Sequence, residues 1–286
     1  MKNLLCGAIV TVSAGVIIVG NIHWNQKISA HAGQIVKRDT SVIVQEVVEV
    51  EPEPEPIKEK TPQQTEQEKK EQELAEYTKN LPPELRNKII NASQNGKTLT
   101  IAIYGSESSS NEKGAWPNLL KQQLAKTYGE KLFNIKVLSE GDKTTVDVIR
   151  SNSYEKVNEL KPDIIIFEPF MISDNSGKIS MKNRIGYLQK ILSSWKKENE
   201  QVTILLQPSN PIYSATYFPT QVEEIKNFAK KNNITYIDHW ENWPDEKNNK
   251  LKQYLTPSNQ PNPSGHKLWA EHLGEYFGAG TEGQVP

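Results

Sequence analysis

The stretch "DIIIFE", residues 163–168, decides the fold of this chain. Three isoleucines and a phenylalanine stand between two acidic residues, and a short run of this kind is typical of a strand that is buried on both faces. Such a strand needs a layer of helices on each side of its sheet. The segment therefore predicts the central strand of a domain in which helices cover both faces of a parallel sheet.

Four further apolar runs predict strands, and amphipathic segments lie between them. The runs are "TLTIAIY" (98–104), "FNIKVLSE" (133–140), "VTILLQ" (202–207) and "ITYID" (234–238). Helical spacing of apolar residues predicts helices over residues 116–129, 144–160, 184–197, 221–231 and 264–277. The alternation predicts a three-layer α/β/α, doubly wound (flavodoxin-like) domain with a five-stranded parallel sheet.

In sheets of this kind, ligands bind at the carboxyl ends of the strands. The residues that directly follow the strands are therefore the candidates for a functional site. They are residues 105–110, 140–145, 168–175, 207–213 and 238–243.

The composition excludes several classes of function. The net charge is -1 over 286 residues, which gives no sign of the basic surface that nucleic-acid binding requires. The single cysteine, Cys6, excludes an internal disulfide framework. Gly105 stands alone and makes no glycine-rich phosphate loop, so we expect no cofactor. We also expect no metal, because no spacing motif supports a site built from Glu107, Asp142, Asp174, Asp238 and His239.

The amino terminus predicts contact with a membrane. An uncharged apolar run over residues 4–19 follows Lys2, and residues 1–24 are interpreted as a signal anchor. A cleaved signal peptide with its small-residue site at Ala30-His31-Ala32 is the alternative. The first interpretation predicts a single-pass membrane protein with its domain on the extracytoplasmic side, and the second a secreted protein.

The next segment, residues 25–80, is interpreted as a charged stalk. "EPEPEP" (51–56) favours extended structure, and the following Glu-, Gln- and Lys-rich stretch has too few apolar residues to form a core. A helix that binds a partner is the alternative for this second part. We expect that residues 33–80 do not pack on the domain, that the domain covers residues 81–286, and that the protein is a monomer.

Four sequence blocks, each at a predicted carboxyl end or at the last helix, resemble the SGNH (GDSL-like) hydrolase family over residues 98–277. They are "IYGSESSSNEKGAW" (103–116), "SEGDKTT" (139–145), "EPFMISDNSG" (168–177) and "SNQPNPSGHKLWAE" (258–271). The resemblance implies ester hydrolysis by a serine nucleophile, a histidine base and oxyanion-binding groups. Where the family's catalytic residues are replaced in this chain, the resemblance implies the fold but not the catalytic activity.

Three of the family's catalytic positions are replaced in this chain. The nucleophile position falls on Glu107, which has no hydroxyl, and the histidine and aspartate positions hold Gln260 and Pro257. Ser106 and Ser108 flank the first position, and either one is a candidate nucleophile. Gln260 is expected to point into the cleft near these serines, where its amide cannot act as a base.

Two histidines remain as candidate bases. His239 follows the fifth strand and His266 lies in the last helix, although each has a structural interpretation as a residue of loop or helix packing. Asp238 precedes His239 and is expected to point the other way. By resemblance, oxyanion binding falls to Gly141, Ser173 and Asn175, and the cleft is lined by Glu107, Asp174, Asp238 and Gln260.

Two functions of different class follow. The first is an extracytoplasmic esterase or deacetylase that acts on an ester or on an acylated glycan or lipid of the cell envelope. The second is a catalytically silent binding module that uses the same cleft. A purely structural surface protein is a third alternative, supported by the stalk alone.

Overall fold

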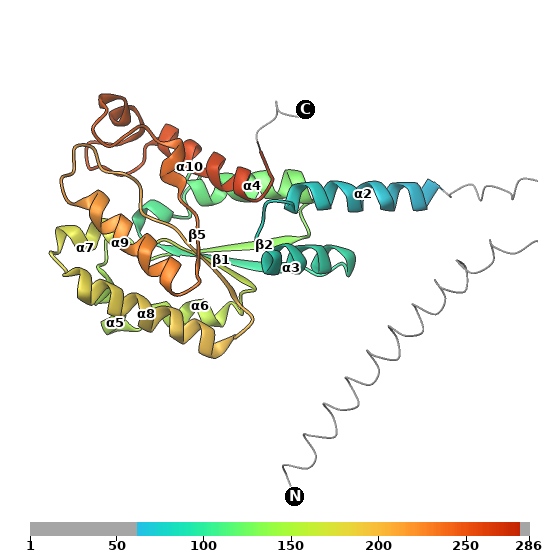
Figure 1. Ribbon diagram of the computed structural model, residues 1–286, viewed down its shortest axis with the longest axis horizontal. Helices are drawn as coiled ribbons and strands as arrows, with labels where there is room; N and C mark the ends of the chain where they lie inside the picture. Colours follow the sequence, from blue (N-terminus) through green and yellow to red (C-terminus); the bar gives the residue numbers. More distant parts are fainter. Residues whose placement is uncertain (1–61, 281–286) are drawn as a thin grey trace, which may run out of the picture. The chain divides into compact units, whose positions relative to one another are not determined.

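The computed structural model describes residues 62–280 (Figure 1). The predicted anchor, the alternative cleavage site and residues 25–61 of the stalk lie outside the described residues. Within residues 62–280, no helix combines the length and the apolar character that crossing a bilayer requires.

The sheet has five strands, all parallel, in the order β2-β1-β3-β4-β5. This is the flavodoxin-like order, and it confirms both the predicted sheet and its central strand. The strands are β1 (Leu99–Gly105), β2 (Phe133–Ser139), β3 (Ile164–Phe167), β4 (Thr203–Leu206) and β5 (Thr235–Tyr236). All four residues of β3 are buried, as "DIIIFE" predicts.

Helices cover both faces of this sheet (Figure 1). One face packs against α3 (Pro83–Gln94), α4 (Trp116–Tyr128) and α10 (Pro263–Tyr276). The other face packs against α5 (Thr145–Ser151), α6 (Lys156–Glu159), α8 (Met181–Glu198) and α9 (Phe218–Lys231). The remaining elements are α7 (Met171–Ser176), η1 (Glu107–Ser109), η2 (Ser153–Glu155), η3 (His239–Asn242) and η4 (Asn249–Tyr254).

The helix predicted over residues 144–160 is broken in the structure. Thr144 and Asp147 form a capping box that begins α5, but Asn152 adopts a left-handed conformation with φ 51°. Asn accepts this conformation more readily than most residues, and it ends α5 and leads into η2 and α6. The apolar pattern of the segment continues across this break, which is why it predicted one helix.

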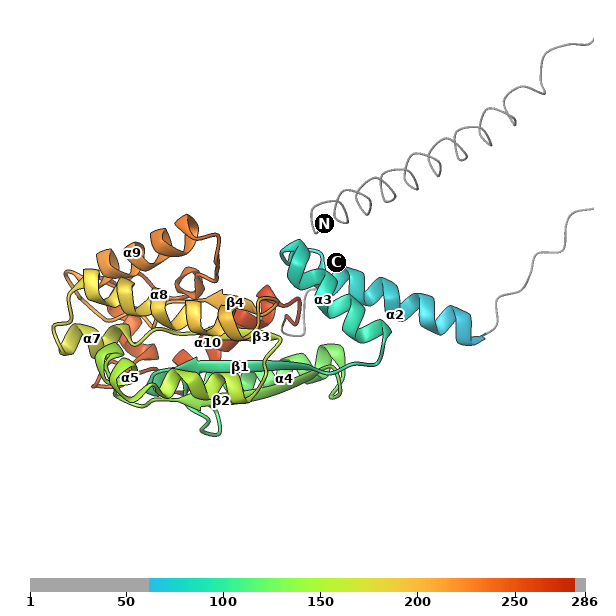
Figure 2. The ribbon, with the colours of Figure 1, turned by 90° about the horizontal axis from the view of Figure 1, so that it is seen from below.

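The end of helix α2 (Pro62–Thr78) packs on the domain (Figure 2). Leu74 is 8% exposed and belongs to the same hydrophobic core as β1, and the Tyr77 ring meets the Tyr128 ring edge to face at 5.6 Å. A Cβ atom added at Gly278 would lie 2.0 Å from the Tyr77 carbonyl oxygen, so the segment after α10 touches the end of α2. These contacts contradict the prediction of an unpacked stalk for residues 74–78 alone, and residues 33–61 of that prediction lie outside the described residues.

Candidate active site

The turn after β1 brings Ser106 against a carboxylate. Ser106 caps η1 and its side chain accepts a hydrogen bond from the Ser108 N–H. The preceding residue is Gly105, where an added Cβ would lie 2.6 Å from Glu168 Oε2 and 2.8 Å from Ser109 Oγ. Only a glycine leaves room for the carboxylate to come this close to the strand end.

Glu168, the first residue after β3, is the centre of a buried hydrogen-bond network. Its Oε2 accepts bonds from the Ser106 N–H at 2.8 Å, from Ser106 Oγ at 2.8 Å and from Ser109 Oγ at 3.0 Å. Its Oε1 accepts a bond from Ser209 Oγ, which reaches it from the loop after β4. The carboxylate thus holds together the loops that follow β1, β3 and β4.

The surroundings of Glu168 favour proton uptake. Complete burial raises the pKa of Glu168 to about 7, although the hydrogen bonds from Ser209, Ser106 and Ser109 pull it down. A carboxyl group with this pKa is present in both protonation states at neutral pH. It can therefore accept a proton from the Ser106 hydroxyl, to which it is already hydrogen-bonded.

A second cluster joins Ser108, Asn210 and Gln260. Ser108 Oγ lies 3.0 Å from Asn210 Oδ1 and 2.5 Å from Gln260 Oε1. A hydroxyl has one proton, so it can donate to only one of these oxygens at a time. With the Gln260 amide turned by 180°, its NH2 would donate to Ser108 Oγ while the Ser108 hydroxyl donates to Asn210 Oδ1. Asn210 is fixed by its own bonds to the carbonyls of Pro211 and Asn259.

The loop before α10 gives Gln260 its position. Pro261 pairs with Leu255 in an antiparallel bridge, and the Asn262 side chain caps α10 by accepting bonds from the N–H groups of Ser264 and Gly265. An added Cβ at Gly265 would lie 2.2 Å from the Tyr254 carbonyl oxygen. These constraints direct Gln260 to Ser108, whereas Ser106 is bonded to Glu168 and not to Gln260.

His239 lies in the core. It is fully buried, its Nε2 lies 2.9 Å from the Pro208 carbonyl oxygen, and its Nδ1 accepts the indole N–H of Trp243 at 3.0 Å. Its ring stacks on Trp269 at 4.0 Å, and burial lowers the pKa of His239 to about 3. Both nitrogens are engaged, which favours the interpretation of His239 as a residue of core packing over its assignment as a base.

His266 is occupied at the start of α4. Its Nδ1 accepts a hydrogen bond from the Trp116 N–H at 3.3 Å, and burial lowers the pKa of His266 to about 4. Within residues 62–280, no hydrogen bond joins His266 to Ser106 or Ser108. Its position favours the structural interpretation, in which it satisfies a free N–H of the first helical turn.

The predicted oxyanion groups do not converge on one serine. The Gly141 carbonyl accepts the Glu107 N–H at 2.8 Å, so Gly141 does lie beside the nucleophile turn, with its own N–H 3.3 Å from Ser139 Oγ. The Glu107 side chain is exposed. Ser173 and Asn175 lie on α7, and in the described part of the chain no hydrogen bond connects them to that turn.

The two predicted cleft aspartates have structural partners instead. Asp174 is buried and accepts bonds from the Thr145 N–H at 2.7 Å and hydroxyl at 2.5 Å, with Arg184 Nε at 4.0 Å. Asp238 forms an ion pair with Lys226 at 2.6 Å on the surface. The structure thus assigns Asp174 to the start of α5 and Asp238 to α9, and neither to the cleft.

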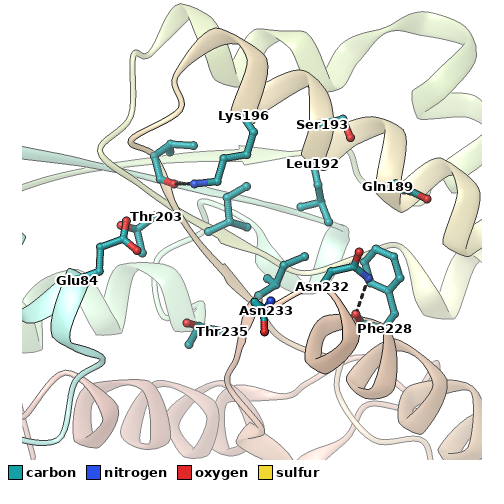
Figure 3. A pocket seen from close by; sticks show the side chains of 13 residues that line it. Glu84, Gln189, Leu192, Ser193, Lys196, Thr203, Phe228, Asn232, Asn233 and Thr235 are labelled. Carbon is teal, nitrogen blue, oxygen red and sulfur yellow. Dashed lines mark hydrogen bonds between the residues drawn. The ribbon is translucent and has the colours of Figure 1, made fainter. Parts of the chain in front are cut away.

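Two cavities bear on the location of a ligand. One of 290 Å³ lies at the amino ends of β4 and β5 and is lined by Thr203 and Thr235 and by Leu192 and Phe228 (Figure 3), so it is remote from the serines. The other, of 330 Å³, is lined by Pro257 and Asn259 of the Gln260 loop. Residues 62–280 hold no cluster of three or more metal-ligating side chains.

The sequence reasoning missed four residues of these clusters, namely Ser109, Glu168, Ser209 and Asn210. All four stand in loops that were singled out after predicted strands. The sequence did contain a signal for Glu168. It directly follows a strand of four apolar residues, and a residue at the end of a buried strand is expected to be buried as well.

The comparison by sequence finds no similar protein, whereas the comparison by structure finds several. No protein-family model and no curated protein matches the sequence. Among solved structures, a lipolytic protein of the G-D-S-L family from Desulfitobacterium hafniense is 20% identical, with a TM-score of 0.50 over 63% of this chain and 99% of that one. A carbohydrate esterase of family 3 from Talaromyces cellulolyticus is 16% identical, with a TM-score of 0.53 over 62% and 95%.

An acetyl xylan esterase is 14% identical, with a TM-score of 0.52 over 62% of this chain and 98% of that chain. At these identities the likeness concerns the fold, and each of these proteins is matched over nearly its whole length. The chain has the fold of the SGNH, or GDSL-like, hydrolases.

Proposed function

We propose that this protein is an extracytoplasmic ester hydrolase in which Ser106 is the nucleophile and Glu168 the general base. The observation that carries the proposal is the 2.8 Å hydrogen bond from Ser106 Oγ to a buried carboxylate at the carboxyl end of the central strand. The pKa of about 7 at Glu168 supports it, because a base works best near the operating pH.

The proposed reaction has two halves. Glu168 takes the hydroxyl proton as Ser106 Oγ attacks the ester carbonyl, and it returns the proton to the departing alcohol, which leaves an acyl-serine. Water then attacks the acyl group, gives a proton to Glu168, and releases the acid as Ser106 regains its hydrogen. The carboxylate replaces the histidine of the family in both halves.

Ser106 is only 5% exposed, which sets a condition on this reaction. An ester carbonyl reaches its Oγ only if the turn at residues 107–110 moves. A moving loop that admits substrate is a common feature of hydrolases.

We propose acetylated sugars of the cell envelope as the substrate class. Acetyl xylan esterase and carbohydrate esterase are names of similar structures, and such esters suit a domain held at the outer face of a membrane. The membrane anchor of residues 1–24, the extracytoplasmic side and the monomeric state are parts of this proposal.

The test compares two neighbouring serines. The full chain is treated with a fluorophosphonate probe and assayed with p-nitrophenyl acetate, alongside Ser106→Ala, Ser108→Ala and Glu168→Gln. We expect labelling at Ser106, loss of turnover in Ser106→Ala, and a loss of about 100-fold or more in Glu168→Gln, since a general base contributes that much. Ser108→Ala is the matched control and should keep most of the activity.

A silent binding module is the second candidate, and one observation favours it. Gln260 stands where the family has its histidine, and with Asn210 it holds the Ser108 hydroxyl in a closed set of hydrogen bonds. An unlabelled, inactive chain that still binds an acetylated oligosaccharide would establish this candidate and exclude the hydrolase.

A further inference from the structure

The cavity of 330 Å³ is linked to the candidate active site by hydrogen bonds. The carbonyl of Asn259, which lines the cavity, accepts a bond from Asn210 Nδ2 at 2.8 Å, and Asn210 Oδ1 in turn accepts the Ser108 hydroxyl at 3.0 Å. Thr256, which also lines it, accepts the N–H of Gln260 at 3.1 Å through its Oγ1. A ligand in this cavity would therefore rest on the same loop that contacts Ser108, on the turn that also carries Ser106.

The chemistry of the cavity wall favours an anion. The wall carries one cation, Lys252, and no carboxylate. Lys252 Nζ lies 4.2 Å from the centre of the Tyr213 ring, and the Tyr213 hydroxyl donates to Asn249 Oδ1 at 2.6 Å. The ring is thus held in place and positions the ammonium group, because a cation is attracted to an aromatic face.

Among the other wall residues, Thr256 adds a hydroxyl group and Asn259 an amide group, which suit a sugar, and Leu255 and Pro257 add apolar surface. The volume is near the lower end of about 300–1,000 Å³ for small-molecule sites, enough for one sugar residue with a charged substituent. The sequence from residue 245 to 252 has three lysines and two acidic residues, and of these charged residues only Lys252 lines the cavity.

We infer that this cavity binds an anionic substituent, a carboxylate or a phosphate, on the sugar that carries the ester. The inference rests on the proposed function, and it narrows the substrate from acetylated sugars to acidic acetylated sugars. Lys252 is then a residue that determines specificity, and Tyr213 positions it.

The experiment measures selectivity in the full chain. The kcat/KM values are determined for a neutral acetylated xylooligosaccharide, for an acetylated galacturonic acid oligosaccharide and for an acetylated sugar phosphate, so that the last two separate a carboxylate from a phosphate. We expect the wild type to prefer one of the acidic substrates. Lys252→Ala should lower the ratio of acidic to neutral kcat/KM about tenfold, through KM, because a hydrogen bond to a charged group is lost.

Lys250→Ala is the matched control, because Lys250 is an exposed lysine of the same helix that does not line the cavity. It should leave the ratio unchanged. An equal effect of both variants would mean that the general positive charge of the three lysines, and not the cavity, sets the preference, and this would contradict the inference. Turnover with no preference for acidic substrates would also contradict it.

A binding measurement separates this inference from the proposed function. Calorimetry with Ser106→Ala and an unacetylated galacturonic acid oligosaccharide or sugar phosphate needs no turnover. Binding that Lys252→Ala weakens and Lys250→Ala does not would uphold the cavity even if the wild type never hydrolyses an ester. If neither ligand binds but the wild type still hydrolyses esters, the inference that the cavity binds an anion is wrong and the proposed hydrolase function is unaffected.

Discussion

Glu168 determines how the candidate site responds to pH. Only its ionised form can take a proton from Ser106, and its pKa is about 7 because it is buried. We expect the rate of fluorophosphonate labelling at Ser106 to rise with pH through about 7 and to level off above it. The labelling rate of Glu168→Gln should be low and flat over the same range, and a wild-type profile without this step would remove Glu168 as the base.

His239 makes the fold sensitive to acid. Its folded pKa of about 3 lies below the value of 6.5 for an exposed histidine, so the unfolded chain binds the extra proton first as the pH falls. Stability from His239 is complete above pH 6.5 and is lost as the pH falls toward 3. One pKa unit corresponds to about 1.4 kcal/mol, so about 2 kcal/mol is lost between pH 6.5 and 5.

The raised pKa of Glu168 has the opposite effect on the free energy of unfolding. Between about pH 7 and pH 4.5 the folded state binds the proton more tightly than the unfolded chain, so the contribution of Glu168 to stability increases as the pH falls. The histidine contribution is therefore isolated as a difference. In urea unfolding, the free energy of unfolding of the wild type minus that of His239→Asn should be about 2 kcal/mol smaller at pH 5 than at pH 7, because Glu168 contributes equally to both proteins. An equal difference at the two pH values would mean that His239 takes up its proton in the folded state.

Gln260→His should not by itself create an esterase. The new imidazole would reach Ser108, but Pro257 supplies no carboxylate to orient it, and an unoriented histidine is a poor base. Turnover of p-nitrophenyl acetate by Ser106→Ala with Gln260→His should stay at the level of Ser106→Ala alone. A clear gain would show that Ser108 needs only a base to become a nucleophile.

At the level of elements, the start of α10 is held by one side chain. Asn262 accepts the N–H groups of Ser264 and Gly265, and its amide donates to the Gln253 carbonyl at 2.8 Å. We expect Asn262→Ala to lower the free energy of unfolding by about 1–2 kcal/mol in urea titrations, as loss of an N-cap does. Asn262→Asp keeps the accepting oxygen and loses the donor, so its loss should be smaller; an equal loss would mean that the cap contributes little.

The elements show how far sequence patterns reach. The buried strand β3 was predictable, because a short run of β-branched and aromatic residues between two acidic residues is typical of a strand covered on both faces. The break at Asn152 was not, because a left-handed residue leaves the apolar spacing on either side unchanged. In the site, the position of Gln260 followed from the loop pattern, whereas the Glu168 network depends on three loops that meet only in the folded sheet.

For the molecule as a whole, the folded unit begins within α2. Leu74→Ala should lower the free energy of unfolding by about 2 kcal/mol or more, because it empties a buried position in the core. Glu71→Ala, an exposed position on the same helix, is the control and should have little effect. Limited proteolysis should release a fragment that begins before Leu74, and a stable fragment that starts at Leu81 would contradict the packing of α2.

The contact between Tyr77 and Gly278 also has a mechanical consequence. The described part of the chain begins with α2 and ends beside it, next to α3 (Figure 2). Lys88 of α3 donates to the Asp163 carbonyl just before β3, so this region lies at the amino ends of the strands. Ser106 directly follows β1 and lies at the carboxyl ends. A force applied between the two ends of this unit would load the α2–Gly278 contact and bypass the sheet. We therefore expect pulling on both ends to detach α2 at low force while the sheet stays folded, with the candidate active site on the unloaded side.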